Sequence, residues 1–289
     1  MLYRIEHQTL LTYSRSEVRE HHTEIRLTPR QDCWQRVMHH AISVDPAQWV
    51  GSYIDYFGND VDYYHAIQEH DSLCVKVVME IETLRTNPFD GQSFSGEDAQ
   101  RFYQKSLAEN PRLFDYILHR SNVVPALAKL QKVLKEMPPL RTRETAGIND
   151  LLELMAWVQR VLCYAPGTSE VHSELVNVVA SGCGVCQDFT HLFIALVRSW
   201  GIPARYVMGY MDAGICLEDE VLATHAWAEV LTPGVGWLGF DPVHGLVVND
   251  RYVAMAVGRD SYDAAPLRGS YKGGDGGDTP RVAVTIVNQ

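Results

Sequence analysis

The sequence has few cysteines, little positive charge and no long apolar run, and each shortage excludes a class of protein. Six cysteines in 289 residues are too few for a disulfide-stabilised scaffold, so we expect reduced thiols. Twenty-five basic against 36 acidic side chains give a formal charge of -11, which argues against nucleic acid and anionic membranes as partners. No stretch reaches the roughly 18 apolar residues of a membrane span, and no signal-peptide pattern opens the chain, so we expect a cytoplasmic protein.

Short segments rich in Val, Ile, Tyr and Thr follow one another from the N-terminus to about residue 84. No helical pattern separates them, and parallel strands need long crossover connections, so the segments predict antiparallel strands. Gly58 and Asn59 lie between two aromatic runs and predict a tight hairpin. We therefore expect an N-terminal antiparallel β-sandwich domain over residues 1–90. The expected strands are 2–13, 20–27, 36–44, 51–57, 61–67 and 72–81.

The remainder of the chain, residues 91–289, mixes helical and strand patterns and predicts a second, α+β domain. A polar, turn-rich segment, 85–100, marks the boundary between the two domains. A Gly-rich stretch, 269–277, is expected to be mobile, and the alternating residues 281–287 predict a last strand that adds to an existing sheet. Apolar residues at spacings of three and four predict helices over 113–117, 126–134 and 151–162.

One cysteine lies at the start of an apolar helix. Cys186 directly precedes a helical stripe that ends at Gly201 and Pro203. The free N–H groups and the dipole at a helix N-terminus stabilise a thiolate, and the same N–H groups can hold a negative oxygen on a substrate carbonyl. Gly182 and Gly184 are expected to leave the approach open to a substrate backbone. A buried structural cysteine is the alternative, and position alone does not decide between the two.

A predicted hairpin brings a histidine and an aspartate to one face of a sheet. Two alternating segments flank the turn residues 232–236. If these residues form the loop, His225, Trp227 and Asp241 share a face, with His225 and Asp241 as diagonal neighbours. A one-residue bulge would move one of them to the opposite face.

The three groups complement one another chemically. The imidazole of His225 can take the proton of the Cys186 thiol and return it to a leaving amine. Asp241 would fix the tautomer of that imidazole and stabilise its cation, while Trp227 covers the pair and excludes water. Taken singly, a strand histidine and a turn aspartate are more often structural, so the hypothesis rests on their combination.

Several segments around these residues form a connected set of motifs. They are GVCQDFTHL at 184–192, GIPARYV at 201–207, GY at 209–210, HAWAEV at 225–230, PG at 233–234, GW at 236–237, DP at 241–242 and AVGRD at 256–260. The set resembles the transglutaminase-like superfamily, and in particular its bacterial two-domain members that are assigned as cysteine proteases and carry an N-terminal β domain.

That resemblance implies roles for individual residues. Cys186 corresponds to the nucleophile, His225 to the base and Asp241 to the orienting acid, in a papain-like core of helices packed on an antiparallel sheet. An upstream aromatic residue, Tyr164, is the candidate second oxyanion donor. Gln187 and Trp227 are the other supporting residues.

The chain departs from the family pattern at two positions beside the triad. Val243, followed by His244, stands where members usually have threonine, and Thr190 stands where they usually have alanine. Both changes leave the triad intact, so we expect them to affect substrate preference more than competence.

Cys183 and Cys186 also match a C-x-x-C pattern, which is typical of redox pairs and of half a zinc site. The chain has no second ligand pair at suitable spacing and no βαβ context for a redox motif, so we expect no metal and no cofactor. The pairs 21–22 and 39–40 are histidines on expected strands, where neighbouring side chains point in opposite directions. His191 is expected to pack or hydrogen-bond within the helix, and the acidic run 218–220 to form a solvated loop.

We expect a thiol-dependent amide hydrolase that cleaves peptide or isopeptide bonds of a peptide or protein substrate through a thioester. The alternatives are a protein-glutamine acyltransferase (transglutaminase) that uses an amine acceptor, and a non-catalytic peptide-binding module. Hydrolysis and transfer share the acyl-enzyme, so the triad does not separate them. Hydrolysis is favoured because water needs no dedicated acceptor site, and the intact triad argues against the binding module.

Overall fold

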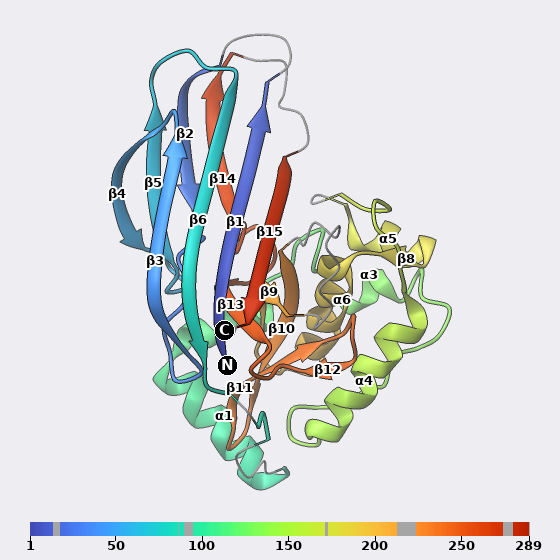
Figure 1. Cartoon of the computed structure of the whole chain (residues 1–289). Coiled ribbons are helices and arrows are strands. Elements are labelled where there is room, and N and C mark those ends of the chain that lie inside the picture. Colours follow the sequence, from blue (N-terminus) through green and yellow to red (C-terminus); the bar gives the residue numbers. More distant parts are fainter. Residues whose placement is uncertain are drawn as a thin grey trace.

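The computed structural model describes residues 1–13, 18–85, 87–89, 95–170, 173–212, 224–273 and 280–288. Cys216 and the acidic run 218–220 lie outside the described residues. Figure 1 shows a tall two-sheet sandwich beside a region in which helices pack on a smaller sheet. This architecture confirms the expected fold class. None of the helices described here is both long enough and apolar enough to cross a membrane.

Two four-stranded antiparallel sheets form the sandwich. Its strands are β1 (Leu2–Thr12), β2 (Arg19–Ile25), β3 (Gln35–Asp45), β4 (Gln48–Ile54), β5 (Asp60–Ala66), β6 (Ser72–Thr83), β14 (Leu267–Lys272) and β15 (Arg281–Asn288). The strand orders are β15-β1-β6-β3 and β14-β2-β5-β4. Every second residue of β6 from Leu73 to Thr83 is buried, which is the two-residue period of a strand with one face on a core. The predicted hairpin between β4 and β5 is confirmed.

The sandwich takes strands from both ends of the chain (Figure 1). β15 pairs with β1 from Tyr3 opposite Asn288 to Leu10 opposite Arg281, so the predicted last strand does add to an existing sheet. β14 pairs with β2, and its central residue Gly269 is opposite Thr23. The expectation of a mobile stretch over 269–277 is therefore wrong as far as Lys272, because backbone pairing with β2 orders these residues, and 274–277 lie outside the described residues.

The second region is built on a five-stranded antiparallel sheet with the order β12-β11-β10-β9-β13. Its strands are β9 (Ala204–Met211), β10 (His225–Thr232), β11 (Gly236–Asp241), β12 (Leu246–Val247) and β13 (Tyr252–Gly258), and a separate parallel pair is β7 (Cys163–Tyr164) with β8 (Cys183–Gly184). The helices are α1 (Glu97–Glu109), the 3-10 turn η1 (Pro111–Phe114), α2 (Asp115–Leu118), α3 (Leu127–Leu130), α4 (Ile148–Val161), α5 (Leu175–Ser181) and α6 (Cys186–Ser199).

The helix predictions hold where the apolar spacing continues for several turns. α4 and α6 occupy their predicted places. The segment 126–134 forms a single turn, α3, and 113–117 is divided between η1 and α2, because stripes this short do not supply enough hydrogen bonds to sustain a helix. α1 begins at Glu97, inside the segment expected to be the domain boundary. The sequence did not indicate this helix because its first turn is polar and only Ala99, Tyr103 and Leu107 along it are buried.

α6 lies at the centre of this region and packs against β9, β10 and α4. All of its residues from Asp188 to Arg198 are buried, so the helix is covered on every side and not only along the predicted apolar stripe. Polar side chains are tolerated on the buried helix because they have partners. His191 accepts a hydrogen bond from the Ser261 N–H (3.1 Å), and Arg198 donates to the backbone carbonyl of Ala204.

Candidate active site

Cys186 is the first residue of α6, directly after the short strand β8. Asp188 holds this turn in place by accepting hydrogen bonds from the Val185 N–H (2.8 Å) and from the Ser169 hydroxyl. The Asp188 side chain is buried, and burial raises its pKa, although these two hydrogen bonds act in the opposite direction. The turn that carries the thiol is thus fixed from the loop before it and from within the helix.

The glycines around the thiol have a different role from the predicted one. Gly184 is buried, and a Cβ at this position would lie 2.9 Å from the Asp188 Cβ and from a Val178 methyl. Close packing therefore requires this glycine, and the expectation that it leaves room for substrate is wrong. Gly182 ends α5 with a φ of 78°, in the left-handed region.

The hairpin of β10 and β11 has the predicted register, with Leu231 opposite Trp237 and Ala228 opposite Phe240. It brings His225 Nε2 within 2.7 Å of Asp241 Oδ2. Because Nε2 faces the carboxylate, Nδ1 is the nitrogen left for the thiol. Burial lowers the pKa of His225, but hydrogen bonds with Asp241 and with Cys186 outweigh it and raise the pKa well above its ordinary value.

Asp241 is fully buried and accepts hydrogen bonds at both carboxylate oxygens. Besides His225, the His244 Nδ1 (2.8 Å) and the Tyr252 hydroxyl (2.9 Å) bind Oδ2. The backbone N–H of Val243 donates to Oδ1 (2.9 Å). Burial alone would raise the pKa of Asp241, and the hydrogen bonds from the two histidines lower it instead, so the carboxylate stays charged.

His244 and Tyr252 both bind Asp241, and the sequence did not assign either of them a contact with that carboxylate. His244 had attracted notice only as a departure from the family pattern, and its short spacing from Asp241 was the available signal. Tyr252 comes from β13, which no local pattern connects to Asp241. Among the described residues, His225, Asp241 and His244 form a group that could hold a metal ion, with ligand atoms within 4.8 Å of one another.

A cavity of about 190 Å³ opens beside the thiol and the imidazole. Cys186 and His225 both line it, as expected if they act on one substrate. The other lining residues carry no formal charge. They are Val185, Gln187, Tyr206, Met208, Thr224, Ala226, Ser261, Ala264, Ala265 and Pro266.

The three predicted supporting residues lie at different places around Cys186 and His225. Gln187 lines the cavity, and its side-chain amide donates to the Glu170 carbonyl (3.0 Å). Trp227 is buried with its ring centroid 6.2 Å from that of His225. Tyr164 is half-exposed on β7, outside the cavity lining, and its pKa is raised by burial and by the charge of Cys186. The Tyr164 role stays a prediction.

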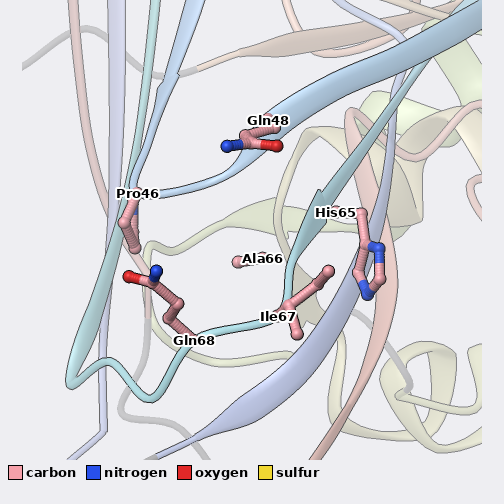
Figure 2. Close-up of a pocket in the computed structure, with 6 residues that line it drawn as sticks. All are labelled: Pro46, Gln48, His65, Ala66, Ile67 and Gln68. Carbon is pink, nitrogen blue, oxygen red and sulfur yellow. The ribbon is translucent and has the colours of Figure 1, made fainter.

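Other cysteines and a second hollow lie outside the lining of the cavity beside Cys186. Cys183, on β8, is a free thiol. The other cysteines that the structure describes are also free thiols. A second hollow, of about 150 Å³, lies in the sandwich, where Figure 2 shows Gln48, His65 and Gln68 around it. It contains no nucleophile paired with a base.

Comparisons with known proteins agree with both halves of the fold. A family model described as the transglutaminase-like superfamily matches residues 138–242, and one described as the bacterial transglutaminase-like N-terminal region matches residues 3–82. An uncharacterized protein of Mycobacterium leprae is 32% identical over 276 residues, which cover 93% of each chain. An uncharacterized protein of Mycobacterium tuberculosis is 30% identical over 288 residues, covering 92% of this chain and 86% of the relative.

A solved structure supports the fold across the whole chain. A protein of Cytophaga hutchinsonii, described as a proposed cysteine protease, aligns with a TM-score of 0.67 and 20% identity. The alignment covers 100% of this chain and 92% of that one, so the sandwich and the helix-and-sheet region occur together in both.

Proposed function

Because this chain belongs to the transglutaminase-like superfamily, we propose that it is a thiol-dependent amide hydrolase acting on peptide or isopeptide bonds. One observation carries the proposal. His225 is held between the buried carboxylate of Asp241 and the thiol of Cys186, which begins a helix and lines a cavity. A nucleophile, a base and an orienting acid thus contact one another in that order, beside a cavity that a substrate can reach.

In the first half-reaction the Nδ1 of His225 takes the thiol proton, and the sulfur attacks the carbonyl carbon of an amide. The carbonyl π electrons move to oxygen, and the N–H groups of Cys186 and Gln187 at the start of α6 stabilise that oxyanion, because the first residues of a helix have no carbonyl within the helix to donate to. The C–N bond then breaks as the imidazolium protonates the leaving amine, and a thioester on Cys186 remains.

In the second half-reaction His225 takes a proton from water, and the resulting hydroxide-like oxygen attacks the thioester. The C–S bond breaks, the acid product leaves, and the sulfur recovers its proton. A primary amine in place of water would yield a new amide by the same steps. Water needs no acceptor site of its own, which is why hydrolysis is the proposed outcome.

The test is a mass-spectrometric screen with a peptide library and a labelled primary amine, scoring cleavage against amine incorporation. We expect cleavage by the wild type, none by Cys186→Ala, and most of the activity in the matched control Cys183→Ala, whose thiol lies outside the cavity lining. Amine incorporation instead of cleavage would replace hydrolysis by acyl transfer. Equal loss in both variants would point to a paired-cysteine function.

Alkylation gives a check that needs no substrate. Iodoacetamide should modify Cys186 faster than free cysteine near neutral pH, and His225→Ala should slow that modification, because the imidazole holds the proton that the thiol gives up. Peptide mapping distinguishes Cys186 from exposed thiols such as Cys33. A Cys186 that reacts no faster than free cysteine would contradict an activated nucleophile.

A further inference from the structure

We propose that His225, Asp241 and His244 form a binding site for Zn²⁺, and that an ion bound there switches off the Cys186 thiol. The binding site stands on geometry alone, whereas the inhibition rests on the proposed function. The sequence predicted no metal, because neither its cysteines nor its neighbouring histidines have the spacing of a zinc site. The third ligand, His244, follows β11 and becomes visible only once the side chains are placed.

The ligand atoms already converge. Asp241 Oδ2 lies 2.7 Å from His225 Nε2 and 2.8 Å from His244 Nδ1, and all three atoms lie within 4.8 Å of one another. Zinc binds nitrogen and oxygen ligands at about 2.0–2.2 Å, so tetrahedral ligands lie about 3.3 Å apart. To admit the ion, each histidine nitrogen would need to move from the carboxylate by about half an ångström, and the two ring nitrogens, which lie within 4.8 Å of each other, would need to approach by up to about 1.5 Å.

The donor set is one that zinc prefers. Two imidazoles and a carboxylate leave a fourth position for water, while magnesium and calcium favour sites made of oxygen. The carboxylate is fixed from behind, since the N–H groups of Val243 and His244 donate to Oδ1. Such support of a ligating carboxylate strengthens metal binding.

The ion has its own route to the site. The His244 side chain is 41% exposed, whereas Asp241 is fully buried and His225 is 13% exposed. His244 does not line the cavity beside Cys186, so its exposed ring offers zinc an approach that does not lead through that cavity.

Zinc at this site would remove the base. Coordination through Nε2 requires a neutral His225 ring whose remaining proton is on Nδ1, and an imidazolium would release one proton to water on binding. With Nδ1 protonated and Nε2 on the metal, the ring cannot accept the Cys186 proton. Asp241 would be coordinating the ion in place of orienting the ring.

Binding is tested without activity, in full-length Cys183→Ala/Cys186→Ala protein titrated calorimetrically with ZnCl₂. We expect one tight equivalent, and at least about tenfold weaker binding after His244→Ala, because one of three ligands is lost. His39→Ala is the matched control, since His39 is exposed on β3, and it should bind as tightly as the parent. Equal affinity in the His244 and His39 variants would overturn the site.

Inhibition is tested with the wild-type thiol, by measuring amide turnover with and without ZnCl₂ and again after chelation. We expect a reversible loss of turnover, and a much smaller loss in His244→Ala relative to that variant's own zinc-free rate. A His244→Ala enzyme inhibited as strongly as the wild type would mean that zinc acts elsewhere. Calorimetric binding in a protein with no turnover under any condition would refute the hydrolase and leave the site standing.

Discussion

Thr190 joins α6, which begins at Cys186, to β10, which begins at His225. Its hydroxyl is completely buried and lies 2.8 Å from the Cys186 carbonyl and 3.2 Å from the Ala226 carbonyl, one residue after His225. The hydroxyl shares its one proton between these two carbonyls, and alanine, which the family resemblance implies at this position, has no hydroxyl to donate. We infer that Thr190 is a positioning residue in this chain, because it links the backbones that carry the two reacting groups.

Replacing Thr190 by valine should lower kcat roughly ten- to hundredfold with little change in KM, since reacting groups displaced by a fraction of an ångström lose much of their rate. Thr190→Ser keeps the donor and should stay close to the wild type. Steady-state kinetics measure kcat and KM of both variants. Thermal denaturation of the same proteins is the control for folding. An unchanged kcat in Thr190→Val would show that the link is dispensable.

At the scale of elements, the sequence predicted those parts of the site that depend on short-range pattern. The start of α6 at Cys186 follows from an apolar stripe, and the register of β10 and β11 follows from a five-residue turn. The sequence could not predict that Tyr252 donates to Asp241, because this depends on where β13 joins the sheet. The full burial of α6 was equally hidden, since its outer face is covered by segments distant in the sequence.

Because α6 is buried, the folding stability of the protein depends on pH through His191, which lies on this helix. Burial lowers the pKa of His191 to about 4, and its Nε2 must stay unprotonated to accept the Ser261 N–H. An unfolded histidine has a pKa of about 6.5, so the unfolded chain binds the proton first as the pH falls. Stability that is complete at neutral pH is therefore lost between about pH 6.5 and 4, by on the order of 3 kcal/mol.

Urea unfolding of the wild type and of His191→Gln at pH 7 and pH 4.5 tests this prediction. The glutamine carbonyl can accept the same bond and does not titrate, so the variant should lose less stability on acidification. Other groups that titrate in both proteins cancel in the comparison. A wild type and variant with equal losses would show that His191 does not carry this pH dependence.

At the scale of the molecule, two side-chain amides join the sandwich to the five-stranded sheet. Asn59 accepts from the Val257 N–H and donates to the Val257 carbonyl, both at 2.8 Å. Gln35 makes the same pair of bonds with Ala254, also at 2.8 Å. β13 is the last strand of its sheet, so these amides supply partners that a further strand would otherwise supply.

Asn59→Asp should reduce the free energy of unfolding by about 1–3 kcal/mol, because a carboxylate cannot donate to the Val257 carbonyl and the group is buried. Gln48→Glu, the same amide-to-acid change at an exposed position of β4, should have little effect. Chemical denaturation at neutral pH compares the two. Equal effects would attribute the loss to added charge and not to the contact with β13.

The pairing of β1 with β15 has a consequence for how the protein is made. β1 leaves the ribosome before β6, and β6 can join it once about residue 83 has emerged. The other edge of β1 lacks its partner until residues 281–288 are synthesised, so it can pair with strands of other nascent chains in the meantime. Chaperones that shield nascent chains should therefore matter for this protein until residues 281–288 have emerged.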